Sequence, residues 1–330
     1  MQSEFEFINR LKINSQKIRR THARVGIGDD CAVLPKNSKN DLVVTTDLLV
    51  EDVDFKLDWS KPEFIGHKAL AVSLSDVAAM GATPVWSMVS IGIPEHVWQT
   101  DFVEKFYDGY LRLASKFDVE LVGGDVSKAP DKIVIDSIVA GEVRRGKAIL
   151  RSTAQVGDLI FVSGELGGAA GGLKLLQNGT RYNSDEKIWR KHLLLRQLQP
   201  FPQVSSGEFL RNKKLATAMI DLSDGLSSDL AHVCSASKVG AQIFAAKIPF
   251  DIKLKPIAKT FEEKIDLALN GGEDFELLFT VNPKKYFRYK NEFKNRRFFQ
   301  IGEITANVGI VELIEGEKIQ ILEPKGFRHF

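Results

Sequence analysis

The chain of 330 residues contains only two cysteines, Cys31 and Cys234, which lie far apart in the sequence. So few cysteines exclude a disulfide framework and a CxxC pair of metal ligands. The sequence also lacks an uninterrupted apolar run of about 18 residues, which a membrane-spanning helix requires. Its first residues, MQSEFEFINRLK, carry acids where a signal peptide has a basic region. We therefore expect a cytoplasmic protein with no membrane partner.

An excess of charge of one sign is also missing. Lysine and arginine total 45, and aspartate and glutamate total 43, which gives a net charge of +2. This balance argues against the broad basic surface of a general nucleic-acid-binding protein. The basic and aromatic stretch at 283–299 is better explained as a solvated amphipathic helix than as a surface on which the bases of a single-stranded nucleic acid stack. The expected partners are small molecules and no nucleic acid.

Familiar catalytic signatures are absent as well. His22, His67 and His96 do not have a metal-ligand spacing such as HExxH, and no serine stands in a nucleophile elbow. The glycine-rich segment at 164–172 lacks the GK[ST] ending of a P-loop, so we assign it to close helix packing. No side chain is therefore proposed as a nucleophile or as a general acid or base.

Hydrophobic periodicity predicts alternating strands and helices in both halves of the chain. In the first half the predicted strands are 42–46, 85–93 and 133–140, and the predicted helices are 60–82 and 101–117. In the second half the predicted strands are 159–163, 215–223 and 275–281, and the predicted helices are 167–177 and 224–237. This alternation predicts an α/β fold in each half. Because 330 residues exceed what one core usually supports, we place a boundary in the polar segment near Lys147, which gives domains 1–146 and 147–330.

What the sequence does contain is a set of seven aspartates in five short segments rich in glycine, serine or threonine. The segments are GIGDD (26–30), TTD (45–47), LSD (74–76), GGD (123–125) and DLSDG (221–225), and nearly all of them close an apolar run. Carboxylate oxygens are the ligands that Mg²⁺ prefers, and glycine-rich turns allow polyphosphate to approach the backbone. Any one of these acids alone would be explained as a helix cap or a turn residue.

Asp76 is the hardest of these acids to explain structurally. At helical spacing it falls on a stripe with Ile65, Ala69 and Val72, and the opposite face of the same helix is apolar too. A buried carboxylate needs a cation or a hydrogen-bond donor nearby, or it takes up a proton. If the five segments converge, their combined negative charge requires several Mg²⁺ ions.

Two further charged residues stand in segments typical of turns. Arg151 lies in the polar segment between the predicted domains, where a guanidinium could grip a phosphate with two hydrogen bonds or could simply be exposed. Glu273 precedes the predicted strand at 275–281 and could bind a cationic or amine-bearing ligand, or serve only the turn.

In their order along the chain, these motifs resemble the thiamine-monophosphate kinase family of the aminoimidazole-ribonucleotide-synthetase-like superfamily. The matching segments are GIGDDCAV, TTDLLVE, KALAVSLSDVAAMGA, LVGGDVSK, IDLSDGLSSDLAH, GGEDFELLFTV and KGFRHF. The resemblance implies a two-domain α/β fold of the α+β type, in which the N-terminal sheets of a homodimer form a barrel. It also implies direct transfer of the γ-phosphoryl group of ATP to thiamine monophosphate, which gives thiamine diphosphate.

The resemblance also implies roles for individual residues. The implied Mg²⁺ ligands are Asp30, Thr45, Thr46, Asp47, Asp76, Asp125, Asp221 and Asp224, with Asp29 adjacent. The implied nucleotide contacts are Tyr107, Gly124, Asp125, Arg151 and Ser223. The implied substrate contacts are Glu273, Phe327 in the ending KGFRHF, and Asp54, which replaces the histidine that the family usually has there.

Other functions remain open at this point. Within the superfamily, a selenophosphate synthetase normally carries a reactive cysteine in an N-terminal glycine-rich segment, and a hydrogenase-maturation protein carries one at its C-terminus. No cysteine precedes Cys31, and the sequence shown ends at Phe330. An aminoimidazole ribonucleotide synthetase is a third alternative. A binding module with structural cation sites is the alternative that is not an enzyme.

Overall fold

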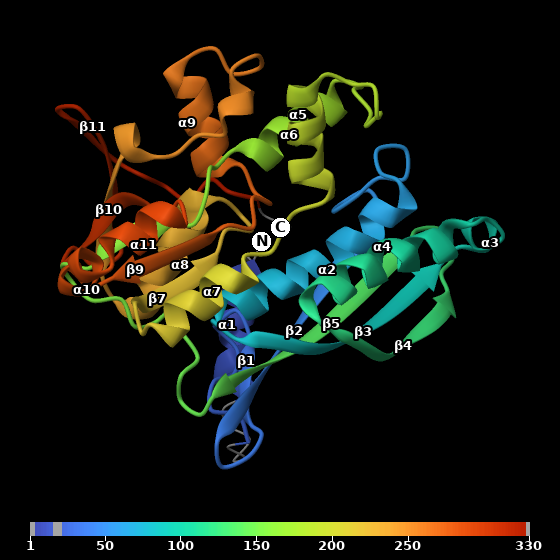
Figure 1. Ribbon diagram of the computed structural model, residues 1–330, viewed down its shortest axis with the longest axis horizontal. Helices are drawn as coiled ribbons and strands as arrows, with labels where there is room; N and C mark the ends of the chain where they lie inside the picture. The colour runs from blue at the N-terminus through green and yellow to red at the C-terminus, as the bar shows by residue number, and fades with distance from the viewer. Residues whose placement is uncertain (1–3, 16–21, 328–330) are drawn as a thin grey trace.

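The computed structural model describes residues 4–15 and 22–327, and its two β-sheets each belong to one half of the chain (Figure 1). The elements of the first half are α1 (Glu4–Ser15), β1 (Ala32–Pro35), β2 (Asn40–Val50), α2 (Pro62–Ala79), β3 (Thr83–Ile93), α3 (Glu95–Trp98), α4 (Phe102–Phe117), β4 (Glu120–Lys128) and β5 (Val134–Arg144). The five strands form a sheet in the order β1-β2-β5-β3-β4. All neighbours in it are antiparallel except β3 and β4, which are parallel.

The second half forms a seven-stranded mixed sheet in the order β12-β11-β8-β10-β6-β9-β7. Its strands are β6 (Leu159–Val162), β7 (Ala216–Asp221), β8 (Gly240–Phe244), β9 (Leu277–Val281), β10 (Phe299–Thr305), β11 (Val311–Glu315) and β12 (Lys318–Ile321). Its helices are α5 (Gly168–Gln177), α6 (Ile188–Leu198), α7 (Val204–Asn212), α8 (Leu226–Ser237), α9 (Phe261–Asn270), α10 (Pro283–Arg288) and α11 (Lys290–Asn295). The predicted mixture of strands and helices in both halves is confirmed.

Helix α2 contacts both halves of the molecule. It lies with α4 on one face of the first sheet, and its C-terminal end reaches α7 and β7 of the second half (Figure 1). Glycines allow its close approach to α4, since a Cβ atom at Gly66 would lie 1.9 Å from the Phe106 carbonyl oxygen and one at Gly109 would lie 1.8 Å from that of Glu63. Ala78 and Ala79 belong to an apolar cluster made otherwise of second-half residues and Ile149. Side chains of α2 can therefore meet residues from either half.

The structure corrects where two of the acidic segments lie. TTD is in the middle of β2, and GGD is inside β4, a strand that the hydrophobic pattern did not predict. We expected both segments at the end of an apolar run, near a turn. The prediction was wrong for GGD because β4 is exposed along nearly its whole length, so it lacks the buried apolar residues by which a strand is recognised.

The connection between the sheets runs from 145 to 158 and includes the position at which we placed the domain boundary. We propose that the boundary lies in this segment, between 146 and 147. In the part of the chain that the structure describes, no helix is long and apolar enough to cross a membrane.

Candidate metal and phosphate site

Three aspartates from distant parts of the sequence meet where the two halves join. Asp30 lies in the loop before β1, Asp76 lies on α2, and Asp221 ends β7. One carboxylate oxygen of each lies within 4.8 Å of the others. The prediction that these segments converge is therefore correct for the first, third and fifth of them.

Hydroxyl groups from α2 and β2 surround this group of acids. Ser75 Oγ donates to Asp221 Oδ2 over 2.6 Å, and Ser73 Oγ donates to Asp47 Oδ2 over 2.7 Å. Thr45 Oγ1 donates to Asp76 Oδ2. Sequence reasoning missed both serines, although Ser73 stands three residues before Asp76 and so on the same side of the predicted helix. These hydroxyls fix the carboxylates in place without neutralising their charge.

Arg151 supplies positive charge to the group. Its Nη2 lies 2.6 Å from Asp30 Oδ1, its Nε lies 3.8 Å from Asp29 Oδ1, and its side chain is 19% exposed. Its backbone N–H lies 3.3 Å from Asp29 Oδ1, and its carbonyl accepts from Ser237 Oγ. Arg151 is therefore not the exposed linker residue that was one of its two sequence interpretations. It is an ordered cation at the edge of the acidic group.

One arginine does not offset the burial of so many acids. Burial, and then the negative charge of Asp30, raise the pKa of Asp29 to about 7. Burial likewise raises the pKa of Asp221 to about 7, with a further contribution from Asp30, and that of Asp47 to about 6. The pKa of Asp76 is raised well above its ordinary value by burial and then by Asp47, Asp221 and Asp30. In the absence of a cation Asp29 and Asp221 are therefore about half protonated near pH 7, whereas Asp47 is mostly ionised there.

An unpaired oxygen indicates what the group is suited to bind. Asp30 Oδ2 is buried, and among the described residues it has no hydrogen-bond partner. A buried carboxylate oxygen without a donor is costly, whereas carboxylate and hydroxyl oxygens together are a donor set that Mg²⁺ accepts. The residues present therefore fit a hard divalent cation.

The loop 221–225 connects this group to a second one at the start of α8. Asp224, Asp229 and His232 have candidate ligand atoms within 4.8 Å of one another. Asp229 accepts the N–H of Gly225, and burial raises its pKa well above the ordinary value. Burial lowers the pKa of His232 to about 4, so its imidazole is neutral near pH 7. Sequence reasoning assigned no role to Asp229 or His232, although their spacing of three residues in a helix places them on one face.

The two substrate residues implied by the family resemblance in the second half are bonded to this same loop. The Glu273 N–H donates to the Ser223 carbonyl over 2.7 Å, and the Phe327 N–H donates to the Asp224 carbonyl over 3.1 Å. Next to Phe327, the Gly326 N–H donates to Ser228 Oγ. The remainder of the KGFRHF ending, 328–330, lies outside the described residues. A single loop thus carries two predicted metal ligands and the attachment points of two predicted substrate contacts.

Five residues implied by the resemblance lie elsewhere in the chain, one of which, Asp54, is in the turn after β2. The Thr46 hydroxyl donates to Asp136, on the sheet face opposite to Thr45 and Asp47. Strand register places Asp47 beside Ser137, then Val89, then Gly124, so Gly124 and the exposed Asp125 are three strands from Asp47, or about 14 Å. Tyr107 lies on α4, with its ring against Phe106 and Tyr110.

Comparisons with known proteins agree over nearly the whole chain. Residues 28–143 match the N-terminal domain of the AIR synthase related proteins, and residues 155–314 match their C-terminal domain. Thiamine-monophosphate kinase of Buchnera aphidicola subsp. Acyrthosiphon pisum is 39% identical, and that of Bacillus subtilis is 36% identical; each alignment covers 99% of both chains. A solved structure described as AaThiL complexed with AMPPCP and TMP superimposes with a TM-score of 0.86 at 34% identity, and covers 99% of this chain and 97% of that one.

Proposed function

The chain belongs to the AIR synthase related family and, within it, to the thiamine-monophosphate kinases, and from this we propose that it phosphorylates thiamine monophosphate with ATP to give thiamine diphosphate. The observation that carries the proposal is the meeting of Asp30, Asp76 and Asp221 between the halves. Relatives with this name, and a similar structure complexed with AMPPCP and TMP, support the choice of substrates. The superfamily alternatives have no comparable support.

We propose that several Mg²⁺ ions are held by the acidic residues. Asp30, Asp76 and Asp221 would form one site, supported by Asp47 and Thr45. Asp224 would hold another, with Asp229 and His232 beside it. When bound, Mg²⁺ would neutralise phosphate oxygens and keep two anionic substrates together.

The acceptor chemistry explains why no general base is needed. The acceptor is a phosphate oxygen that is already ionised near neutral pH. In the proposed reaction this oxygen forms a bond to the γ-phosphorus of ATP, and the bond from that phosphorus to the leaving oxygen of ADP breaks. Arg151, held at the edge of the acidic group, would bind phosphate oxygens in this step. We propose direct in-line transfer, and trapping of a phosphorylated protein during turnover would contradict it.

The other implied contacts divide between the two substrates. Tyr107, Gly124, Asp125, Arg151 and Ser223 would contact the nucleotide. Asp54, Glu273 and Phe327 would contact the organic part of thiamine monophosphate, with the Phe327 ring available for stacking because it is 49% exposed. Thr46 and Asp125, which lie on the other face and at the edge of the first sheet, would ligate a cation other than the one held by Asp30, Asp76 and Asp221.

We also propose that the chain acts as a homodimer through its first sheet. β4 is an edge strand with exposed apolar residues, including Val122 at 45% and Val126 at 47% exposure. On the same sheet, Leu48 is 60% exposed. An uncovered apolar edge is usually paired or covered, so joining two such sheets into a barrel would bury it. A monomer mass in light scattering would contradict this arrangement.

One assay tests the proposed function directly. The full-length protein with Mg²⁺ and ATP should convert thiamine monophosphate to thiamine diphosphate, with equal release of ADP. Riboflavin and aminoimidazole substrates in parallel reactions should not be converted. Tight binding of thiamine monophosphate without ADP formation would instead favour the binding module.

Asp54→His is expected to leave turnover intact. Asp54 Oδ2 accepts the Val50 N–H over 2.7 Å and so closes the turn after β2, a local role that does not depend on the substrate. Loss of this hydrogen bond should cost about 1 kcal/mol of stability, because a histidine ring replaces it only in part. Steady-state kinetics beside thermal unfolding checks both expectations. Loss of activity in a folded Asp54→His protein would show that the carboxylate itself is needed.

A further inference from the structure

Lys68 is a buried cation between the two halves of the molecule. It lies on helix α2, most of whose residues are buried, and is only 4% exposed. A buried ammonium group is costly unless it is paired and hydrogen-bonded. Its Nζ lies 2.6 Å from Glu273 Oε1 and donates to the Asp54 carbonyl over 3.0 Å.

These two partners are the ones proposed above to contact the organic part of the acceptor. Asp54 belongs to the turn after β2 in the first half, and Glu273 belongs to the loop 271–276 in the second half. The Lys68 ammonium group therefore contacts two proposed substrate-binding segments that are more than 200 residues apart in sequence. Neither the acidic motifs nor the family resemblance assigned any role to Lys68.

The Glu273 side chain is held at both oxygens and still has room for a ligand. Lys68 contacts Oε1, and Gln197 Nε2 donates to Oε2. The side chain remains 29% exposed. A carboxylate has about four acceptor positions, so it can take further hydrogen bonds from an amine-bearing ligand. Lys68 and Gln197 thus orient the carboxylate before any ligand binds.

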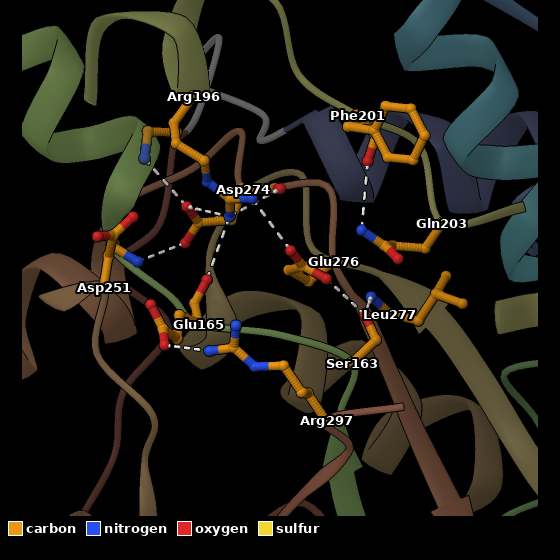
Figure 2. Close-up of polar contacts among 12 residues, drawn as sticks. Ser163, Glu165, Arg196, Phe201, Gln203, Asp251, Asp274, Glu276, Leu277 and Arg297 are labelled. Atoms are coloured by element: carbon orange, nitrogen blue, oxygen red, sulfur yellow. Dashed lines mark hydrogen bonds and ion pairs between the residues drawn. The ribbon is translucent and has the colours of Figure 1, made fainter. Parts of the chain in front are cut away.

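The backbone that carries Glu273 is held in a conformation that needs support. Glu273 has a φ of 65° and Phe275 a φ of 49°, both in the left-handed region, which costs energy for residues other than glycine. Figure 2 shows the polar cluster that fixes the adjoining residues. Arg196 Nη1 donates to Glu276 over 3.1 Å, and Asp274 accepts the N–H groups of Gly167 and Ala169. This cluster thus fixes the main chain beside Glu273, and Lys68 and Gln197 orient the Glu273 carboxylate.

Lys68 also stands at a defined distance from the acidic group. Asp76 follows it by eight residues on α2, which corresponds to about 12 Å along the helix axis. Ser75, which bonds Asp221, lies seven residues from Lys68 and so on the same face. One rigid helix thus carries both the anchor of the Glu273 carboxylate and a member of the phosphate and metal site.

We propose that Lys68 is a positioning residue for the acceptor substrate, which orients Glu273 and the Asp54 turn toward the cationic, amine-bearing end of thiamine monophosphate. This inference rests on the proposed function. It assigns Lys68 to recognition of the acceptor rather than to nucleotide binding or phosphoryl transfer. Because its action passes through Glu273, its loss should weaken binding of thiamine monophosphate and leave the other steps unchanged.

The test compares Lys68→Met with the wild-type protein. Lys68→Met keeps most of the unbranched side chain and removes the ammonium group. It is expected to raise the KM for thiamine monophosphate about 10-fold or more, with the KM for ATP and kcat within about 2-fold. The dissociation constant for thiamine monophosphate, measured by calorimetry with Mg²⁺ and without ATP, should rise by the same factor. Lys61→Met is the matched control, because Lys61 is an exposed lysine just before the same helix, and it should change neither constant.

A double variant separates positioning from a general loss of structure. If Lys68 acts through Glu273, Lys68→Met with Glu273→Gln should bind thiamine monophosphate no more weakly than Glu273→Gln alone. Additive losses would overturn the inference, as would an unchanged KM for thiamine monophosphate in Lys68→Met, or an equal rise for ATP. A wild-type protein that does not phosphorylate thiamine monophosphate would instead refute the proposed function.

Discussion

Asp76→Asn is expected to lower turnover by at least about 100-fold while leaving the protein folded. A carboxylate oxygen of Asp76 lies within 4.8 Å of one from Asp30 and one from Asp221. Asp76 also accepts the Thr45 hydroxyl, which an asparagine oxygen can accept as well. Its pKa is raised well above the ordinary value, which means that its charge is unfavourable in the metal-free protein. Removing that charge should therefore not lower the melting temperature of the metal-free protein, although it removes a proposed Mg²⁺ ligand.

The measurement is the rate of ADP release at saturating substrates, together with thermal unfolding in EDTA. Asp131→Asn provides the control, since Asp131 is exposed in the turn between β4 and β5 and is not among the implied metal ligands or substrate contacts. It should behave as wild type. Turnover of Asp76→Asn near the wild-type rate would contradict the assignment of the metal site.

The second large effect is expected in stability, which should fall with rising pH in the metal-free protein and fall less, or not at all, with Mg²⁺. The pKa values of Asp29 and Asp221 are raised to about 7, and that of Asp47 to about 6, from an ordinary value of 3.8. The folded protein therefore binds more protons than the unfolded chain between about pH 4 and 7. The contribution of these three carboxyl groups to stability is present below pH 4 and is lost as the pH rises through 6 to 7.

Two histidines affect stability in the opposite direction, and they determine the pH range in which the effect of the carboxylates can be measured. Burial lowers the pKa of His67 and of His232, the latter to about 4, so these groups favour folding as pH rises toward 6.5. Above about pH 6.5 the histidines no longer change the stability as the pH rises. A fall in stability of the metal-free protein between pH 6.5 and 8 should therefore report the carboxylates.

Differential scanning calorimetry across this range, with EDTA or with Mg²⁺, measures the effect. The rise in melting temperature on adding Mg²⁺ should increase by several degrees from pH 6.5 to 8, because the cation binds the ionised acids of the folded state only. In Asp76→Asn this increase should be smaller. A Mg²⁺ effect that does not change with pH would show that these acids do not form the cation site.

Much of the fold could be predicted from local sequence patterns. Helix α2 was predicted as 60–82 and is Pro62–Ala79, and β3 was predicted as 85–93 and is Thr83–Ile93. β3 alternates between buried and less buried positions, so its residues show the period of a strand, whereas α2 is apolar on nearly all sides and is bounded by Pro62 and Gly81. β4 could not be found in this way, because most of its residues are exposed within the single chain.

The chemical composition of the site was also determined by the sequence alone. Acids in segments such as DLSDG and LSD indicate a hard cation whatever the fold, because ligand preference belongs to the carboxylate group itself. The resemblance carried by these motifs also identified the family. Both inferences depend on residue type and spacing, which are local properties.

Only the tertiary structure decided which of these groups meet and in what electrostatic state. It brings Asp30, Asp76 and Asp221 within 4.8 Å, turns the Thr46 hydroxyl to the other face of its sheet, and joins Lys68 to Glu273 across the two halves. Such contacts follow from packing of distant segments, and the pKa shifts follow from burial, which no local pattern specifies. The sequence thus determined the chemistry available, and the packing of α2 between the two halves determined where that chemistry is placed.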